Sequence, residues 1–152
     1  MANAHANETY RTEARTDVAE ERRSATPHAL THRDRHALVV DTDPVTARAC
    51  REALEGMRFV IERVDSGVTA VVAARRRVPD IILMDAQLRD ASAAEVIGWL
   101  RCANLALAGV PIIVIGTIDR SQFAVRDSRV TISLRKPLTL AAIERAVRGL
   151  CG

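Results

Sequence analysis

From residue 37 onward, the chain alternates short, almost wholly apolar runs with longer segments in which apolar residues recur every three or four positions. Continuous apolarity is typical of strands that are covered on both faces of a parallel sheet, and the longer period indicates amphipathic helices. The pattern therefore predicts a doubly wound α/β domain of five βα units. The three most apolar runs are Ala37–Val40, Ile81–Met84 and Val110–Ile115.

The remaining elements follow from the same periodicity. Strands are expected at 59–64 and 130–134, and helices at 44–57, 67–77, 93–104 and, over at most two turns, 121–125. The last helix places Leu140, Ile143, Val147 and Leu150 on one face.

Two of the predicted helices begin at a clear local signal. Asp43 sets a capping side chain before Pro44 at the first helical position, and Ser92 with Glu95 forms a capping box. These two helix starts should therefore lie close to the predicted residues.

Residues 1–35 differ from the rest because they are polar and charged and lack an apolar face wide enough to bury. They predict a flexible charged tail, in which Arg11 to Arg23 suits a charged helix, followed by one domain over 36–152. His28, His32 and His36 recur at a spacing of four, which on a helix would align three metal ligands. Neighbouring arginines would repel a cation, so a metal site here is disfavoured.

The composition of the 152-residue chain, 48% hydrophobic and 27% charged, is typical of a soluble globular protein. No apolar stretch is long enough to span a membrane and no secretory signal opens the sequence, so we expect a cytoplasmic protein without membrane insertion. Cys50, Cys102 and Cys151 are far apart and form no CxxC pair, which predicts buried free thiols.

Nucleic-acid binding is disfavoured by the placement of the charge. The net charge is only +3, and the densest basic run, Arg75 to Arg77, closes a predicted helix, where cations complement the helix dipole. The four aromatic residues are not interleaved with bases, as a stacking platform for nucleotides would require.

Charged side chains follow the ends of three predicted strands. Asp41 follows the first strand, Asp85 the third and Lys136 the fifth. Lys136 is the only lysine among 22 basic residues, and a compact ammonium suits phosphoryl or carboxylate oxygens in a tight crevice. Ligands of an open doubly wound sheet bind beyond the carboxyl ends of its strands. We therefore expect two acids and one ammonium to converge there, with Gly116 and Thr117 ending the fourth strand.

Three segments together resemble the receiver domains of bacterial two-component response regulators, and most of all single-domain cell-cycle regulators of the DivK type. They are the string PDIILMDAQL at 79–88, the run PIIVI at 111–115 and the step Arg135-Lys136-Pro137. The resemblance covers about 35–152. It implies a flavodoxin-like (βα)5 fold with a five-stranded parallel sheet in the order 2-1-3-4-5.

The resemblance also implies roles for the residues at the strand ends. Asp85 would be the phosphoacceptor, Lys136 would contact the phosphoryl oxygens, and Asp41 would belong to an acidic pocket that holds Mg²⁺, with the backbone carbonyl of Gln87 as a further ligand. A carboxylate that attacks phosphohistidine approaches a dianionic group, and a shared cation with a nearby ammonium offsets that repulsion. Magnesium usually takes one or two carboxylates and keeps several waters.

Departures from the family pattern fall at functional positions. Thr42 stands where receivers carry a second acid that binds the metal directly, and Asp43 is better explained as a helix cap than as a substitute ligand. Gly116, with Thr117 beside it, replaces the usual Thr or Ser, and Ser133 replaces the aromatic switch residue. We expect the phosphorylation chemistry to be partly retained, the magnesium affinity to be weak, and the switching apparatus to be largely absent.

Two functional hypotheses follow. In the first, the chain is a stand-alone receiver without an output domain and not an enzyme. It accepts a phosphoryl group from a histidine kinase or phosphotransferase and acts on a downstream protein by contact, as a monomer or weak dimer. In the second, a degenerate pseudo-receiver binds its partner whatever its phosphorylation state.

A third hypothesis, a flavin- or nucleotide-binding enzyme of the same fold, is disfavoured. It needs a phosphate-cradling loop after the first strand, and Asp41-Thr42-Asp43-Pro44 is acidic there and lacks glycine.

Overall fold

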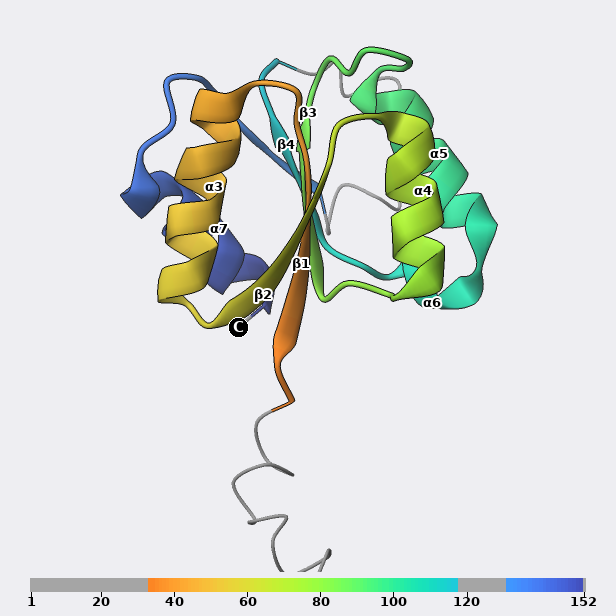
Figure 1. The fold of residues 1–152 in the computed structure, drawn as a ribbon, viewed down its shortest axis with the longest axis horizontal. Helices are drawn as coiled ribbons and strands as arrows, with labels where there is room; N and C mark the ends of the chain where they lie inside the picture. The colour runs from red at the N-terminus through yellow and green to blue at the C-terminus, as the bar shows by residue number, and fades with distance from the viewer. Residues whose placement is uncertain (1–32, 118–130, 152) are drawn as a thin grey trace, which may run out of the picture. The chain divides into compact units, whose positions relative to one another are not determined.

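The computed structural model describes residues 33–117 and 131–151, in which strands and helices alternate along the chain (Figure 1). The helices and strands lie close to the predicted ranges. In chain order they are β1 (Arg35–Val40), α3 (Pro44–Gly56), β2 (Phe59–Val64), α4 (Gly67–Arg76), β3 (Ile81–Asp85), α5 (Ala93–Ala103), α6 (Leu105–Ala108), β4 (Ile112–Ile115), β5 (Thr131–Leu134) and α7 (Leu140–Cys151).

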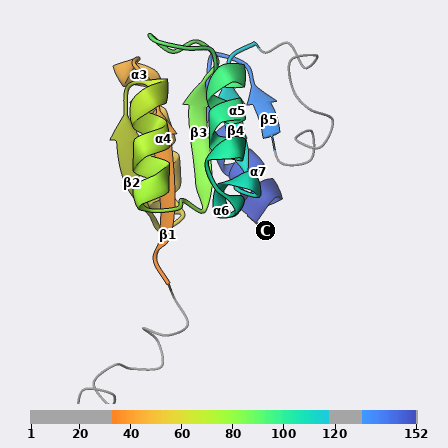
Figure 2. The ribbon, with the colours of Figure 1, turned by 90° about the vertical axis from the view of Figure 1, so that its right-hand side faces the viewer.

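The five strands form one parallel sheet in the order β2-β1-β3-β4-β5, which confirms the predicted topology (Figure 2). In this register Ala37 of β1 lies opposite Ile81 of β3, and Leu83 of β3 lies opposite Ile113 of β4. Each parallel pair needs a crossover connection, and helices in those connections cover the two faces. The carboxyl ends of all five strands consequently lie at one edge of the sheet.

The apolar runs are buried because both faces of the sheet are covered. α3 and α7 pack on one face, and α4, α5 and α6 lie on the other (Figure 1). Successive residues of β1 alternate between the two layers, so that Leu38 joins the core under α4 and α5 while Val39 joins the core under α3 and α7. Burying one such side chain stabilises the fold by about 1.5–3 kcal/mol.

Both predicted helix caps are confirmed. The Asp43 carboxylate accepts a hydrogen bond from the backbone N–H of Val45, and Ser92 and Glu95 form the reciprocal capping box. A further capping box, between Ser66 and Thr69, starts α4. The helices that flank the strand ends therefore begin at positions fixed by local hydrogen bonds.

Several details differ from the prediction. β4 begins at Ile112 rather than Val110, because Pro111 has no N–H for the ladder. The short helix α6 was not predicted, and its end is held by the Arg101 guanidinium, which donates to the carbonyls of Leu107 and Val110. Leu140 is 44% exposed, because it is the first residue of α7 and precedes the buried stretch of that helix.

The cysteine prediction was partly wrong. All three are free, as expected, but only Cys50 is buried, while Cys102 is exposed on α5 and Cys151 is half-buried. Burial raises the pKa of the Cys50 thiol to about 12. No helix in the described part of the chain has the length and apolarity needed to cross a membrane.

Some predictions concern residues outside those described. They are residues 1–32 of the tail predicted over 1–35, with its charged segment, two of the three spaced histidines, and the short helix at 121–125. The last residue of the predicted tail, Arg35, is the first residue of β1. His36 lies in β1, where it is buried.

Candidate functional site

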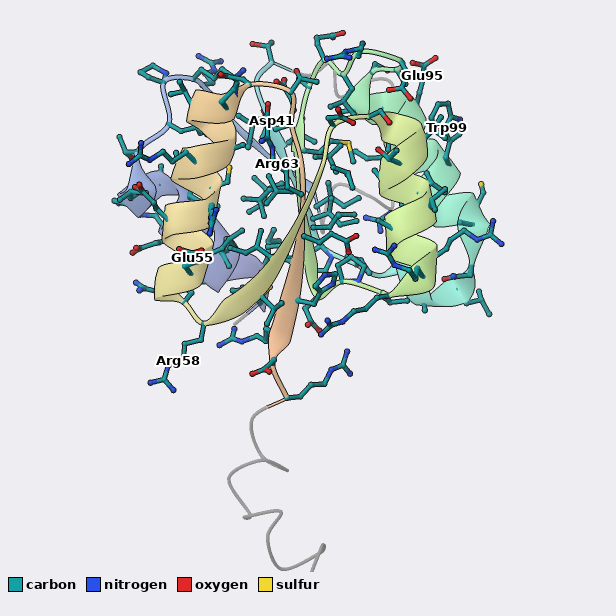
Figure 3. The ribbon with its side chains drawn as sticks, in the orientation of Figure 1. Asp41, Glu55, Arg58, Arg63, Glu95 and Trp99 are labelled. Carbon is teal, nitrogen blue, oxygen red and sulfur yellow. The ribbon has the colours of Figure 1, made fainter. Side chains whose placement is uncertain are left out.

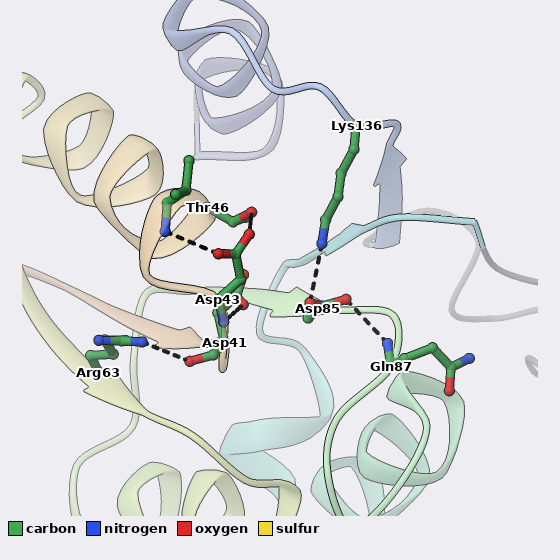
Figure 4. A network of polar contacts seen from close by, with 8 residues as sticks. Asp41, Asp43, Thr46, Arg63, Asp85, Gln87 and Lys136 are labelled. Atoms are coloured by element: carbon green, nitrogen blue, oxygen red, sulfur yellow. Dashed lines mark hydrogen bonds and ion pairs between the residues drawn. The ribbon is translucent and has the colours of Figure 1, made fainter.

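Asp85 and Lys136 meet at the carboxyl edge of the sheet (Figure 4). Asp85 is the last residue of β3, and Lys136 lies in the connection between β5 and α7. The Lys136 ammonium lies 3.3 Å from Oδ2 of Asp85. The Lys136 side chain is 44% exposed and the Asp85 side chain 12% exposed, so the pair lies at a surface that a second molecule can reach.

The second oxygen of Asp85 is also held in place. Its Oδ1 accepts the backbone N–H of Gln87 at 3.2 Å. The backbone N–H of Ala86 donates to the carbonyl of Ile115 at 2.8 Å, which continues the pairing of β3 with β4 beyond the strand. The carboxylate therefore stands in a fixed orientation on a rigid support, as a nucleophile requires.

Asp41 follows β1 and is fully buried, with a relative exposure of 0%. Its Oδ1 accepts the backbone N–H of Asp43 at 2.8 Å, but its buried Oδ2 has no hydrogen-bond partner among the described residues. Burial raises the pKa of the Asp41 carboxyl, and the negative charge of Asp85 raises it further, while the N–H of Asp43 and the Lys136 charge oppose the shift. An unpartnered carboxylate oxygen in this position is suited to a cation.

The donor set fits Mg²⁺ with few protein ligands. The described residues contain no group of three or more His, Cys, Asp or Glu side chains that could hold a metal ion. Asp41 and Asp85 nevertheless supply two carboxylates, and Gln87 supplies a backbone carbonyl in the loop directly after Asp85. Two carboxylates with several waters are a common magnesium environment, and the orphan oxygen of Asp41 fits that role.

Asp43 is occupied elsewhere. Its two oxygens accept hydrogen bonds from the Val45 N–H at 3.1 Å and from the Thr46 hydroxyl at 2.7 Å. The hydroxyl of Thr46, followed by the N–H of Val45, lowers the pKa of the Asp43 carboxyl. These contacts favour its interpretation as the cap of α3 over that of a metal ligand.

Thr42, at the position of the missing acid, is half-buried and lines a hollow of about 440 Å³ beside the strand ends. Arg63 and Arg89 line the same hollow. Arg63 reaches back to donate to the backbone carbonyl of Asp41 at 3.3 Å (Figure 4). Asp65 lines this hollow too, so the neutral Thr42 hydroxyl shares it with two guanidinium groups and one carboxylate.

The predicted switch positions are bonded to each other. The Ser133 hydroxyl donates to the backbone carbonyl of Gly116 at 2.8 Å, and the Gly116 N–H donates to Leu134 at 2.7 Å. Gly116 has φ +120°, and a Cβ added there would lie 2.9 Å from Cβ of Ala86. No side chain fits at this position. Thr117, next to it, is exposed.

Asp90 is a residue of this region that the sequence analysis missed. Its carboxylate accepts the N–H groups of Gly67 at 2.8 Å and Val68 at 3.0 Å, which tether the loop after β3 to the first turn of α4. The Gly67 N–H contributes most to the lowered pKa of the Asp90 carboxyl. Asp90 lies more than twenty positions from Gly67 and Val68 in sequence, so no local motif predicted these hydrogen bonds.

The model of the response regulator receiver domain family matches residues 37–148. The chain belongs to this family. The observed sheet order and the placement of Asp85 and Lys136 agree with the resemblance that the sequence motifs suggested, and that recognition is confirmed.

Two curated relatives illustrate the range of the family. The receiver is 25% identical over 117 residues to the polar-differentiation response regulator DivK of Brucella ovis, covering 76% of this chain and 94% of DivK. It is 35% identical over 82 residues to the probable transcriptional regulatory protein TcrX of Mycobacterium tuberculosis, covering 54% of this chain. That second match spans only 34% of TcrX.

Solved structures show the same fold. The receiver domain of a sensor histidine kinase from Pseudomonas aeruginosa superposes with a TM-score of 0.67 and 24% identity, covering 79% of this chain and 99% of that one. The chemotaxis response regulator CheY4 of Vibrio cholerae gives 0.67 at 16% identity, covering 78% and 99%. The flavodoxin-like architecture is therefore shared although the sequences have diverged widely.

Proposed function

We propose that this receiver accepts a phosphoryl group on Asp85 from a phosphohistidine of a histidine kinase or phosphotransferase, and that it acts on a downstream protein by direct contact. The observation that carries the proposal is the Asp85 carboxylate, which is fixed between the Lys136 ammonium and the Gln87 N–H at an accessible strand end. Both groups can stabilise an anionic oxygen at this position.

The proposed step is a phosphoryl transfer between two side chains. An oxygen of Asp85 forms a bond to phosphorus, the phosphorus–nitrogen bond of phosphohistidine breaks, and the leaving imidazole takes up a proton. Lys136, now paired with the Asp85 carboxylate, remains within reach of the phosphoryl oxygens of the product. The ammonium therefore neutralises part of the charge before and after transfer.

We propose Mg²⁺ as the cofactor, held by the carboxylates of Asp41 and Asp85 and the backbone carbonyl of Gln87. The Pseudomonas aeruginosa relative carries a magnesium ion coordinated in its active site cleft. A bound ion would offset the repulsion between the carboxylate and the incoming phosphoryl group. With Thr42 in place of a second acid, the affinity should be lower than that of a site with three carboxylates.

A second candidate, a pseudo-receiver whose partner binding ignores phosphorylation, is favoured by the switch positions. The Ser133 hydroxyl is engaged by the Gly116 carbonyl, and Gly116 offers no side chain to move toward a phosphoryl group. A modification that biases no two-state element transmits no signal. The two candidates share a partner surface and differ in whether phosphorylation changes it.

Intact-mass measurement after incubation with acetyl phosphate and Mg²⁺ tests the phosphoacceptor. We expect one phosphoryl increment on the wild type and on Asp43→Asn, and none on Asp85→Asn. Asp43→Asn is the matched control, because it removes one carboxylate from the same edge of the sheet but keeps a capping side chain. An increment on Asp85→Asn would exclude Asp85 as the acceptor, and none on the wild type would favour the pseudo-receiver.

A further inference from the structure

A hollow of about 650 Å³ lies between α3 and the strand β2, and Asp41, Asp85 and Lys136 are not among the residues that line it. Its α3 wall consists of residues at helical spacing, and because they recur every three or four positions the hollow follows the helix along its length. The β2 wall contributes Phe59, Val60, Ile61 and Arg63. The α3 wall contributes Pro44, Ala47, Arg48, Arg51 and Glu55. Figure 3 shows Glu55 toward the carboxyl-terminal end of α3 and Arg63 toward the carboxyl end of β2.

Among the described residues, the strand beside this groove has an unpaired edge. β2 is the first strand of the sheet order, and in the described parts of the chain it pairs only with β1 (Figure 2). The Asp41 N–H donates to the carbonyl of Val64 at 3.1 Å, so the backbone of Val64 faces β1. Because backbone groups alternate along a strand, Phe59, Ile61 and Arg63 direct their N–H and C=O groups to the open edge. An extended segment can hydrogen-bond there.

The groove has an apolar floor. Val39 and Phe59 are buried beneath it, and Ile61 is half-buried at its side. Side chains at alternate positions of an added strand would point toward this floor. The six residues of β2 match an added segment of about six residues, or roughly 20 Å in extended form.

The rim of the groove is basic. Arg48 forms an ion pair with Glu52 at 3.1 Å, and Arg51 forms one with Glu55 at 2.7 Å. The charges of these four side chains therefore cancel. Arg63 adds a further positive charge at one end of the groove. At the other end Arg35 lies over the Phe59 ring at 5.1 Å, and the exposed Arg58 precedes Phe59 in sequence (Figure 3). Among the residues that line the groove, three arginines, Arg48, Arg51 and Arg63, stand against one acid, Glu55, so the groove favours a negatively charged partner.

We propose that this groove binds an extended acidic segment of a partner protein, which adds to β2 as a parallel or antiparallel sixth strand. A second copy of the chain is a poorer occupant, because it would set the same arginines against one another. The site is separate from the Asp85 phosphoacceptor and does not require phosphorylation.

Nuclear magnetic resonance on the ¹⁵N-labelled full chain tests the proposal, with an end-blocked eight-residue peptide of alternating valine and glutamate as probe. We expect the amide signals of Phe59, Ile61 and Arg63 to shift and their hydrogen exchange to slow. Shifts confined to other regions, or no binding, would overturn the proposal. If these amides already exchanged slowly in the free protein, and more slowly at higher protein concentration, the edge would pair with a second copy of the chain, and the proposal would be overturned.

Two backbone-modified probes test strand addition itself. In one, every valine is N-methylated, and in the other, every glutamate, so that one of them removes the donors that face β2. We expect one of the two to lose binding while the other retains it. Equal binding of both would exclude strand addition.

Charge reversal on α3 tests the role of the rim. Arg51→Glu should weaken peptide binding roughly fivefold, measured by fluorescence anisotropy. Arg148→Glu on α7 is the matched control, because Arg148 also pairs with a glutamate four positions away. It should leave the affinity unchanged. Arg48→Glu repeats the test if Arg51→Glu does not fold. Equal affinities for all variants would exclude a basic rim as the determinant.

Discussion

The two ends of β1 each bury one titratable side chain, and burial shifts the two pKa values in opposite directions. His36 near the amino end is 3% exposed and Asp41 after the carboxyl end is 0% exposed. Each has one buried polar atom for which the described parts of the chain supply no hydrogen-bond partner, Nδ1 in His36 and Oδ2 in Asp41. Burial lowers the pKa of His36 and raises the pKa of Asp41, so the fold favours the neutral form at both ends.

The neighbours of these two residues differ. At the amino end, Asp80 accepts the His36 N–H and returns its own N–H to the His36 carbonyl, both at 2.7 Å. Glu62 lies 3.6 Å from His36 and also pairs with Arg76. At the carboxyl end Asp41 faces a second acid, Asp85, and a single ammonium. The polar groups at the amino end are therefore largely satisfied within the fold, whereas two acids share one ammonium at the carboxyl end, where we propose that a cation and a phosphoryl group bind.

The largest effect is expected from Gly116→Thr, which would restore a hydroxyl at the carboxyl end. Its Cβ would lie 2.9 Å from Cβ of Ala86, and the φ of +120° is unfavourable for a branched side chain. We expect the free energy of unfolding to fall by about 3 kcal/mol, measured by urea denaturation.

Gly149→Ala is the control for that variant, because no atom of the described residues lies within 4 Å of the Cβ that would be added on α7. It should stabilise the protein by about 0.5–1 kcal/mol. If Gly116→Thr left the free energy of unfolding unchanged, the backbone at the end of β4 would be adaptable. Steric hindrance would then not explain why this position lacks a hydroxyl.

A smaller effect of opposite sign is expected from Asp41→Asn. Removing the buried charge beside Asp85 should raise the free energy of unfolding by about 1 kcal/mol. The same variant should bind Mg²⁺ more weakly by calorimetry. Glu62→Gln at the amino end, which breaks contacts that are satisfied, should instead destabilise. A lower free energy of unfolding in Asp41→Asn would contradict the idea that charge at the carboxyl end of β1 costs stability while charge at the amino end contributes to it.

The smallest effect is the pH dependence from His36. Its lowered pKa, caused first by burial and then by the Arg77 charge, means that the unfolded chain binds a proton more readily than the folded one. Arg76 acts in the same direction, and Glu62 and Asp80 oppose it. Stability is therefore fully present above about pH 6.5 and declines as the pH falls below it.

The slope should stay below the one-proton limit of about 1.4 kcal/mol per pH unit. Urea unfolding of the wild type and of His36→Gln between pH 8 and pH 5 isolates this contribution. The range brackets the unperturbed histidine pKa of about 6.5. We expect the variant to show a flatter profile. Identical slopes in the two proteins would assign the acid sensitivity to other groups.

Local signals predicted much of the fold. The apolar runs located the strands, because parallel strands are buried on both faces. Asp43 and Ser92 located two helix starts, because a capping side chain bonds to residues two or three positions further along the chain. The boundary of β4 was misplaced, because apolarity alone does not register the missing N–H of Pro111. α6 and the exposure of Cys102 depend on packing between helices, which periodicity does not encode.

The sequence by itself determined that Asp41, Asp85 and Lys136 stand at the carboxyl ends of different strands, and in a parallel sheet those ends lie at one edge. Only the tertiary structure decided how they are satisfied. The unpartnered oxygen of Asp41 results from its burial. The hydrogen bonds from Ser133 to Gly116 and from the first turn of α4 to Asp90 connect residues that are remote in sequence. Hydrogen bonds of this kind form only after the sheet has brought distant segments together, and no local pattern specifies their geometry.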